Sequence, residues 1–271
     1  GLEAACTAAE VGCNTFLLEK GNELGGLASL ISKIPAKNRL ADFPHYLMHR
    51  AEQLDNLYIF KNTEGTPENI RKFHPNIIVS STGSAPLLPP IAGLKDRIDN
   101  ENHNIYSILG MISHINDFPK DLEGKKVVVV GGGAVGLDVV EFFADRNADI
   151  SIVEMMDRIG RDLDPVSKND TKTMMKKHNV HQLTKTALLE VKDSSFLVRG
   201  DGEPYELPFE YGFVCLGMRA QGQLYQNLTE EFSSEDVEIM NIGDSQRARR
   251  IIDGTQEGRN ILTILEQKGY L

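Results

Sequence analysis

Four residues carry the clearest chemical meaning in this chain: the glycines Gly131, Gly133 and Gly136, spaced as G-x-G-x-x-G, and the carboxylate Glu154. The glycines directly follow a β-branched run at 127–130 and open a segment with the apolar period of a helix. In that setting the first glycine allows a tight turn, the second lets the backbone approach a pyrophosphate, and the third lets the helix pack on the strand. A helix N-terminus also offers N–H donors and positive partial charge. The pattern predicts a dinucleotide site, the alternative being a glycine-rich turn in an ordinary α/β domain.

Glu154 bears on the choice of dinucleotide. It ends a second strand at 150–153, the position where an acid hydrogen-bonds the adenosine ribose. A carboxylate about 5 Å from a 2′-phosphate is repelled by roughly 3 kcal/mol per unit charge at an effective dielectric constant of about 20, which favours NAD over NADP. Arg158 and Arg161 follow in the next loop. They either soften this preference or form a solvated loop paired with neighbouring aspartates.

The first residues of the chain repeat this pattern. Gly1 precedes Glu19 by 18 residues, the same separation as between the last motif glycine and its acid. The similar segments 77–83 and 211–217 follow at nearly the same offset. Two matched landmarks indicate two copies of one dinucleotide-binding fold. The first strand of copy one would then lie before Gly1, so we expect a first copy that is truncated at its N-terminus.

The repeat predicts an α/β protein with two Rossmann-like dinucleotide-binding domains, the second inserted into the first. We expect residues 1–93 and 236–271 to form the first domain, 94–120 a linker, and 121–235 the second domain. Periodicity and turn residues predict strands at 57–60, 76–81, 181–186, 187–192, 195–199, 205–208, 211–216 and 238–244, and helices at 42–53, 105–111, 165–177 (with Asp164 as cap) and 251–268. In the last helix, Ile252, Ile261, Ile264 and Leu265 are the expected core residues.

Composition excludes several functional classes. The 271 residues carry a net charge of −10, which argues against nucleic acid and anionic membrane surfaces as partners. No apolar run approaches a membrane span and no secretory signal is present, so we expect a cytoplasmic protein. The three cysteines form no C-x-x-C pair, which argues against a dithiol centre or a cluster site within this chain. His178 and His181 lack a third ligand nearby, so we expect no metal site.

The segment Asn241-Ile242-Gly243-Asp244, followed by a helix, makes a family resemblance specific. Copy one, an inserted copy two and this closing motif resemble the two-dinucleotide-domain flavoprotein reductases, which have a glutathione-reductase-like fold. In that superfamily the first copy binds FAD and the second binds NAD(P)H. The resemblance implies that Asp244, with Gly243, lies by the FAD ribityl and pyrophosphate.

A narrower resemblance covers nearly the whole chain. The segments GLEAA, LLEKGNELGG, STGSAPLLPPIAG, VVVVGGGAVGLDVVEFFA and NIGDSQRARRIIDG resemble the C-terminal part of 2-enoate reductases and 2,4-dienoyl-CoA reductases. In that family an N-terminal TIM barrel carries FMN and a 4Fe-4S cluster and reduces an activated C=C bond. The resemblance implies an electron-entry module that passes hydride from NADH to FAD, with the barrel as partner and a 2-enoate as its substrate. It also allows a homo-oligomer. Two alternatives remain: the same module of a dienoyl-CoA reductase or amine dehydrogenase relative, and a non-catalytic nucleotide-binding scaffold that holds ADP or nothing and serves assembly.

The resemblance also implies roles for individual residues. It places FAD against Gly1, Glu19, Lys20, Gly25, Gly26, Gly243 and Asp244. The chain would cross between the two copies at Thr82 and Gly83. The resemblance places NADH against Gly131, Gly133, Ala134, Gly136, Asp138, Glu154 and Gly217. Asp138 would lie near the nicotinamide amide or serve only as a helix-dipole partner. Hydride transfer needs no side-chain acid or base, so no catalytic residue is predicted.

Overall fold

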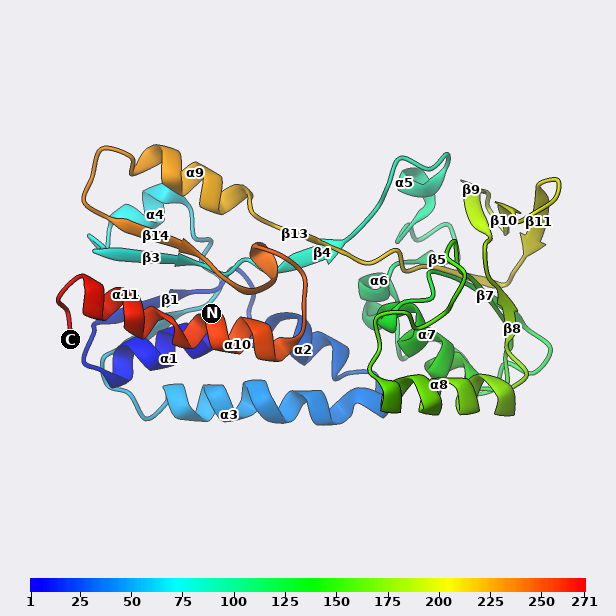
Figure 1. Ribbon diagram of the computed structural model, residues 1–271, viewed down its shortest axis with the longest axis horizontal. Coiled ribbons are helices and arrows are strands. Elements are labelled where there is room, and N and C mark those ends of the chain that lie inside the picture. Colours follow the sequence, from blue (N-terminus) through cyan, green and yellow to red (C-terminus); the bar gives the residue numbers. More distant parts are fainter. The chain divides into compact units, whose positions relative to one another are not determined.

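The computed structural model describes residues 1–271, which divide into two units. The first unit comprises residues 1–32, 37–85 and 218–271, and the second comprises 33–36 and 86–217 (Figure 1). The second unit is therefore inserted into the first, as predicted. The boundaries differ from those expected: residues 94–120, expected as a linker, belong to the second unit, and 218–235 belong to the first.

The second unit is built on a parallel sheet of order β5-β12-β6-β7-β8. Its strands are β5 (Ile105–Tyr106), β6 (Lys126–Val130), β7 (Asp149–Val153), β8 (His181–Leu183) and β12 (Tyr211–Val214). A separate antiparallel sheet joins β9 (Ala187–Val191), β10 (Ser195–Arg199) and β11 (Tyr205–Pro208). The helices are α5 (Leu94–Arg97), α6 (Ile108–Ser113), α7 (Ala134–Ala144) and α8 (Pro165–Lys177). This is the expected dinucleotide-binding arrangement, with the glycine motif between β6 and α7.

The β-branched run of β6 is buried on both faces of this sheet, as an unbroken apolar strand requires. Val128 and Val130 pack in one core cluster with Phe196 and Val198 of β10. An aromatic cluster occupies another core region, where the Phe118 ring lies 5.1 Å from that of Phe143, on α7. This packing explains why residues 94–120 are not a linker: Phe118 is buried and Ile105 begins an additional strand.

The first unit contains two separate parallel ribbons. One pairs β1 (Thr15–Leu18) with β2 (Leu57–Phe60), and the other pairs β3 (Ile77–Ser80) with β14 (Glu238–Asn241). A further pair joins β4 (Ser84–Pro86) to β13 (Met218–Ala220). The helical segments are α1 (Leu2–Glu10), α2 (Gly26–Ile31), α3 (Asp42–Ala51), α4 (Pro67–Arg71), α9 (Gln223–Glu231), η2 (Gly243–Ser245), α10 (Ile251–Arg259) and α11 (Ile261–Gln267). The short helix η1 (Pro35–Ala41) begins in the second unit and ends in the first.

Ion pairs fasten α1 to two other helices of the first unit. The Glu3 carboxylate lies 2.9 Å from Arg50 on α3 and 2.8 Å from Arg259 on α10, and its side chain is only 6% exposed. Burial alone raises the pKa of the Glu3 carboxyl, but hydrogen bonds from Arg259 and Arg50 outweigh burial and hold the pKa below its ordinary value. The buried carboxylate is therefore charged and paired at neutral pH.

Several predicted elements are confirmed and others need correction. The helix expected at 165–177 is α8, and the Asp164 carboxylate caps it by accepting from two backbone N–H groups. The helix expected at 105–111 starts only at Ile108, because Ser107 caps it and the two residues before Ser107 form β5. The helix expected at 251–268 is divided into α10 and α11 at Asn260. Ile252, expected in the core, is 56% exposed, because nine residues at 100° per residue place it on the helix face opposite the buried Ile261.

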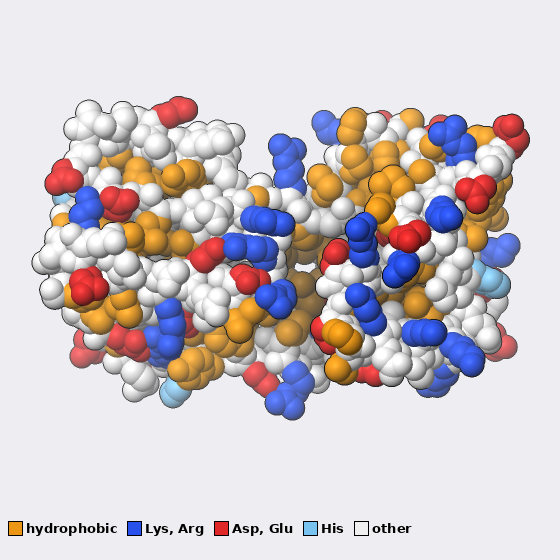
Figure 2. Space-filling view, in the orientation of Figure 1, with side chains coloured by type: hydrophobic (Ala, Val, Ile, Leu, Met, Phe, Trp, Pro, Cys, Tyr) orange, Lys and Arg blue, Asp and Glu red, His pale blue; other side chains and the backbone are white.

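Charge is unevenly spread over the surface. Lys and Arg side chains gather over α8 on the face shown in Figure 2, although the chain as a whole is acidic. The lysines of α8, Lys168, Lys172, Lys176 and Lys177, are all exposed. None of the helices combines the length and the apolar composition that a membrane-spanning helix requires.

Candidate functional site

The glycine motif of the second unit forms a tight turn at the carboxyl end of β6. Gly131 has φ +110°, and a Cβ there would lie 2.1 Å from the Cys215 carbonyl oxygen. A Cβ on Gly136 would lie 1.9 Å from the Gly131 carbonyl oxygen, so the helix packs directly on the turn. Nothing lies within 4 Å of the position that a Gly133 Cβ would take. The first and third glycines are thus required by packing, whereas Gly133 faces open space.

The start of α7 can receive an anion. Gly133 is its N-cap and no side chain caps the helix, so the first N–H groups have no side-chain partner. Ala134, the first helical residue, is exposed. With the open space at Gly133, these donors fit the pyrophosphate of a dinucleotide, as the sequence predicts.

Glu154 lies beside this turn and is held in place by backbone donors. Its Oε2 accepts from Gly132 N at 2.6 Å, and its Oε1 accepts from Met156 N at 2.7 Å. Each carboxylate oxygen keeps a further lone pair that can accept from a ribose hydroxyl. Arg158 contacts the neighbouring Asp157 at 3.6 Å and is 82% exposed, as in a solvated, locally paired loop. The Glu154 carboxylate is therefore hydrogen-bonded to the backbone of the glycine turn.

Asp138 and Gly217 lie near the carboxyl ends of the same sheet. Burial, with a contribution from the negative charge of Asp138, raises the pKa of the Cys215 thiol to about 12. Asp138 itself lies on α7, four residues after the start of that helix at Ala134. Gly217 follows Cys215 with φ +99°, is exposed, and is the last residue of the second unit. The assignment of these two residues to the nicotinamide stays a prediction.

In the first unit, Glu19, the acid of copy one, has a backbone hydrogen bond like that of Glu154. The Glu19 carboxylate accepts from Gly21 N at 2.8 Å, just as Glu154 accepts from the N–H two residues after it. Gly25 and Gly26 have φ +97° and +54°, and a Cβ on Gly25 would lie 2.0 Å from Ser29 Oγ. Lys20 is exposed. The expected FAD residues of this segment lie on one turn-rich loop after β1.

Gly1 and the pair Thr82-Gly83 lie at the ends of neighbouring elements. A Cβ on Gly1 would lie 2.5 Å from Ser81 Oγ, so the start of α1 meets the end of β3. Thr82 Oγ donates to the Gln221 carbonyl at 2.5 Å, and Gln221 N donates to Gly83 O at 2.9 Å. The chain leaves the first unit after Ala85, shortly beyond the residues at which the crossing was expected.

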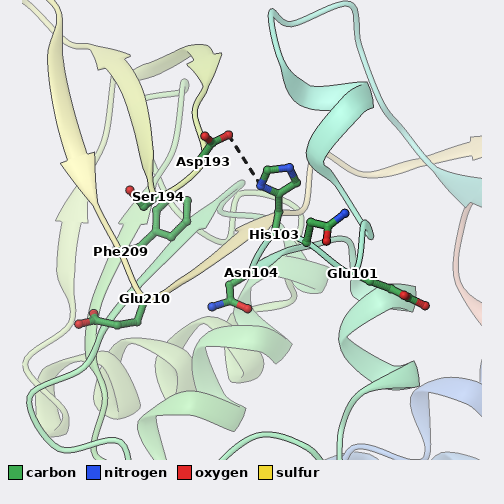
Figure 3. A pocket seen from close by; sticks show the side chains of 8 residues that line it. Glu101, His103, Asn104, Asp193, Ser194, Phe209 and Glu210 are labelled. Carbon is green, nitrogen blue, oxygen red and sulfur yellow. Dashed lines mark ion pairs between the residues drawn. The ribbon is translucent and has the colours of Figure 1, made fainter.

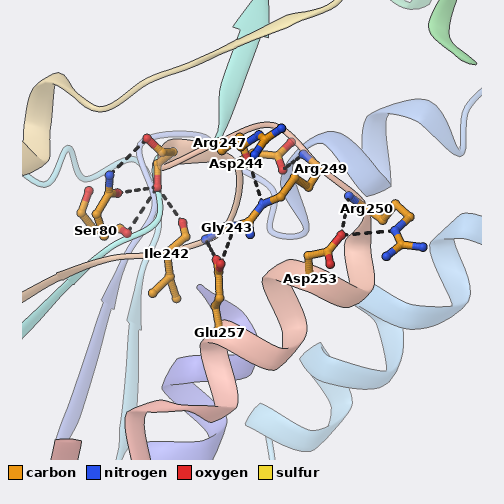
Figure 4. A network of polar contacts seen from close by, with 11 residues as sticks. Ser80, Ile242, Gly243, Asp244, Arg247, Arg249, Arg250, Asp253 and Glu257 are labelled. Carbon is orange, nitrogen blue, oxygen red and sulfur yellow. Dashed lines mark hydrogen bonds and ion pairs between the residues drawn. The ribbon is translucent and has the colours of Figure 1, made fainter. Parts of the chain in front are cut away.

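Asp244 is positioned by partners that the sequence did not indicate. Its Oδ2 accepts from Ser84 Oγ at 3.1 Å. Its Oδ1 accepts from Arg249 N at 3.0 Å, within the network drawn in Figure 4. Gly243, with φ +65°, donates its N–H to Glu257 at 2.6 Å, and Glu257 also pairs with the Arg249 guanidinium. The Gly-Asp motif thus sits in a closed polar network. Ser84 precedes Asp244 by 160 residues, a separation that leaves no local pattern in the sequence.

Two open pockets lie away from these residues. The larger, of about 370 Å³, is lined by Glu101, Asn102, His103, Asn104, Asp193, Ser194, Phe209 and Glu210 (Figure 3). Asn104 and Glu210 directly precede β5 and β12, so this pocket is at the amino ends of the strands. The smaller pocket involves the amino ends of β6 and β7. Ligands of parallel sheets bind at the carboxyl ends, which leaves both pockets outside the predicted site.

Neither metal ligation nor dithiol chemistry has a visible site. No three His, Cys, Asp or Glu side chains are grouped to hold a metal ion, and His181 lies 3.5 Å from Asp149. All three cysteines are free, and Cys6 and Cys215 are buried.

Comparison with known proteins supports this architecture. Residues 47–240 match the model of the pyridine nucleotide-disulphide oxidoreductases. The chain belongs to this family. Membership makes it part of an oxidoreductase family that binds FAD and NAD(P)H. The three cysteines of this chain are free and none lies in a C-x-x-C pair.

Similar proteins are considerably longer than this chain. An NADH oxidase of Thermoanaerobacter brockii is 26% identical over 95% of this chain and 38% of its own length. A cinnamate reductase of Clostridium sporogenes is 22% identical over 93% of this chain and 36% of its own length. The solved structure of 2-naphthoyl-CoA reductase shares the fold with a TM-score of 0.81 at 22% identity, over 96% of this chain and 37% of that one. The predicted resemblance to the dinucleotide-binding part of larger flavoprotein reductases is confirmed, and the chain spans about two fifths of these relatives.

Proposed function

We propose that this chain is the electron-entry module of a larger flavoprotein reductase, in which NADH binds the second unit and FAD binds the first. When both are bound, NADH supplies a hydride and FAD accepts it. The observation that carries the proposal is the hydrogen bond between Glu154 and Gly132 N, which joins the ribose-reading acid to the phosphate-binding turn at the carboxyl end of the sheet. Family membership supports the pair of cofactors.

The residues of the second unit select and orient the nucleotide. The free N–H groups at the start of α7 bind the pyrophosphate, and the absence of a side chain at Gly133 leaves room for it. Glu154 accepts from the ribose hydroxyls and repels a 2′-phosphate, so the module uses NADH in preference to NADPH. In the first unit, Glu19 takes the corresponding place on the FAD adenosine, and Asp244, held by Ser84, lies by the flavin side chain.

The acceptor of the electrons is proposed to be a C=C bond of a 2-enoate, reduced in a separate barrel domain that carries FMN and a 4Fe-4S cluster. Similarity to proteins named for cinnamate and 2-naphthoyl-CoA reduction supports this choice. No group of metal-ligating side chains occurs within this chain, so a cluster would be held by residues outside it. We propose that the complete protein works in the cytoplasm.

Calorimetric titration of the purified chain with NADH and with NADPH tests the first part of the proposal. We expect NADH to bind at least about tenfold more tightly than NADPH, from the repulsion at Glu154. Addition of FAD, followed by NADH without oxygen, should bleach the flavin absorbance. NADH binding without flavin reduction would limit the module to nucleotide binding. Failure of both nucleotides to bind would favour the non-catalytic scaffold.

A further inference from the structure

Gly132, which lies between the first two glycines of the motif, has both of its backbone groups hydrogen-bonded. Its N–H donates to Glu154 Oε2 at 2.6 Å, and its carbonyl oxygen accepts from Gly160 N at 2.7 Å. Gly132 is buried, so these two partners take the place of water. A Cβ on Gly132 would lie 2.9 Å from Glu154 Oε2, which explains why this position of the turn is also a glycine. Two segments outside the motif therefore hold the glycine turn.

Gly160 is the point at which the loop after β7 folds inward. Residues 155–158 and 161–162 are exposed, whereas Gly160 is buried. Gly160 has φ +66°, in the left-handed region that favours glycine. A Cβ there would lie 3.2 Å from Leu163 Cδ1 and 3.6 Å from Leu137 Cδ1, on α7. The loop thus approaches the glycine turn and α7 through a residue that has no side chain.

The hydrogen bond from Gly160 fixes the direction of the next N–H group of the turn. The peptide bond between Gly132 and Gly133 is trans, and in a planar trans peptide the C=O and N–H groups point in opposite directions. Because the Gly132 carbonyl points to Gly160, the Gly133 N–H points away from the loop. The Gly133 N–H has no hydrogen-bond partner within the chain. It therefore stays available at the N-cap of α7, where an anion is expected.

Glu154 and Gly160 hold two different peptide groups of the turn. Glu154 accepts from Gly132 N, which belongs to the peptide before Gly132, and Gly160 donates to the carbonyl of the peptide after it. The second bond of Glu154, from Met156 N, lies in the same loop, but Met156 has an anchor of its own, since its carbonyl accepts from Lys185 N at 2.9 Å. A change at Gly160 should therefore leave the Glu154 carboxylate in place.

We propose that Gly160 is a positioning residue for the nucleotide: its N–H orients the peptide between Gly132 and Gly133 so that Gly133 N–H donates to the pyrophosphate. This inference rests on the proposed function, because it concerns the same nucleotide site. Glu154 selects between NADH and NADPH at the ribose. Gly160 strengthens the binding of both nucleotides equally, because both carry the same pyrophosphate. Gly160 lies outside the G-x-G-x-x-G motif, so the motif alone does not indicate this role.

Three variants of the full chain test this role. In Gly160→Val a β-branched residue would have to adopt φ +66°, which is strongly disfavoured, so the loop backbone should change conformation and turn its N–H away from Gly132. Gly160→Asn should keep the hydrogen bond, because asparagine adopts the left-handed conformation readily. The matched control is Gly124→Val, in the turn before β6. Gly124 has φ +73° and nothing within 4 Å of its Cβ position, so the control carries the same backbone penalty away from the site.

Each variant that urea unfolding shows to be folded is titrated calorimetrically with NADH and with NADPH. We expect Gly160→Val to bind both nucleotides about tenfold or more weakly, with the ratio of the two affinities unchanged, because one hydrogen bond to a charged phosphate is lost. Gly160→Asn and Gly124→Val should bind as tightly as the unaltered chain. If Gly160→Val does not fold, NMR of the unaltered chain labelled with 15N-glycine decides the question. ADP, but not adenosine, should then shift the Gly133 amide resonance, and the Gly160 amide should be protected from hydrogen exchange.

Several results would overturn the role of Gly160. Unweakened binding by Gly160→Val would show that the hydrogen bond does not matter for the nucleotide, and a changed ratio of NADH to NADPH affinity would show that the loop acts through Glu154. Equal weakening by Gly160→Asn or by Gly124→Val would assign the loss to something other than the orientation of the Gly133 N–H. In the NMR measurement, an unshifted Gly133 resonance or an unprotected Gly160 amide would have the same meaning. Binding of neither nucleotide by the unaltered chain would refute the proposed function itself, and this role with it.

Discussion

Replacing Glu154 by glutamine tests the link between the acid and the glycine turn. Both carboxylate oxygens accept from backbone N–H groups, at 2.6 Å from Gly132 and 2.7 Å from Met156. Glutamine can accept through only one oxygen, so one of the two donors would face an NH₂ group. A hydrogen bond to a charged group contributes about 1.5–3 kcal/mol. Because Glu154 is only half-buried, we expect the variant to lose about 1–2 kcal/mol of unfolding free energy.

The same substitution should change nucleotide choice. The carboxylate repels a 2′-phosphate at about 5 Å by roughly 3 kcal/mol per unit charge at a dielectric constant of about 20. Solvent around the half-exposed group reduces this to about 1.5 kcal/mol, or about tenfold in affinity. We expect Glu154→Gln to raise the affinity for NADPH relative to NADH by about this factor, with the larger part of the change in NADPH binding.

Urea unfolding and calorimetric titration with both nucleotides measure the two effects. The matched control is Asp149→Asn, which removes the same charge from the amino end of the same strand, β7. We expect the control to leave the affinity ratio unchanged, because the amino end lies far along the strand from the turn. An unchanged ratio in Glu154→Gln, with NADH still bound, would refute the role of this carboxylate in selecting the nucleotide.

Three further predictions follow from the same structure. Gly136→Ala should destabilise the second unit by about 2 kcal/mol or more in urea unfolding, since its Cβ would lie 1.9 Å from a carbonyl oxygen. Gly133→Ala, whose Cβ would have nothing within 4 Å, should leave stability unchanged but weaken NADH binding in calorimetry. The Glu3 carboxyl has a lowered pKa in the folded chain, so its stabilisation is full above the ordinary carboxyl pKa and is lost as the pH falls through the folded-state pKa. Unfolding midpoints measured from about pH 6 to 3 should show this loss. Glu3→Gln should abolish this pH dependence and lower the unfolding free energy by about 3 kcal/mol at neutral pH. The Cys215 thiol is buried and its pKa is raised to about 12, so it should resist a thiol-alkylating reagent until urea unfolds the chain. Mass spectrometry of the labelled peptide measures this, and labelling in the folded state would contradict the burial of Cys215.

Local sequence patterns predicted the features of this protein that depend on local geometry. The glycine spacing, the β-branched run of β6 and the cap at Asp164 each act within one turn or one strand, so the residue types alone indicate them. The repeat of the Gly-to-Glu separation even predicted the inserted second domain. Phe118 illustrates the limit: it lies in a polar stretch, and only its packing against Phe143 and other distant rings makes its segment part of the second unit.

The same local patterns could not predict polar networks between segments that are distant in the sequence. Ser84 and Asp244 meet because β3 and β14 are neighbours and the two segments leave the same sheet edge. Nothing in either local sequence distinguishes Ser84 from a solvent-exposed serine of a loop. The arginines after Asp244 show the same limit: Arg249 pairs with Glu257 and Arg250 with Asp253, and a run of charges in the sequence does not indicate these partners.

The two copies hold their acidic side chains by the same local hydrogen bond. Glu19 and Glu154 each end the second strand of a copy, and each accepts from the backbone N–H two residues later. These bonds fix each carboxylate by its own turn, without a bound ligand. Glu154 has one further bond, from Gly132 N in the turn after β6, so its carboxylate is fixed to the glycine turn as well as to its own loop.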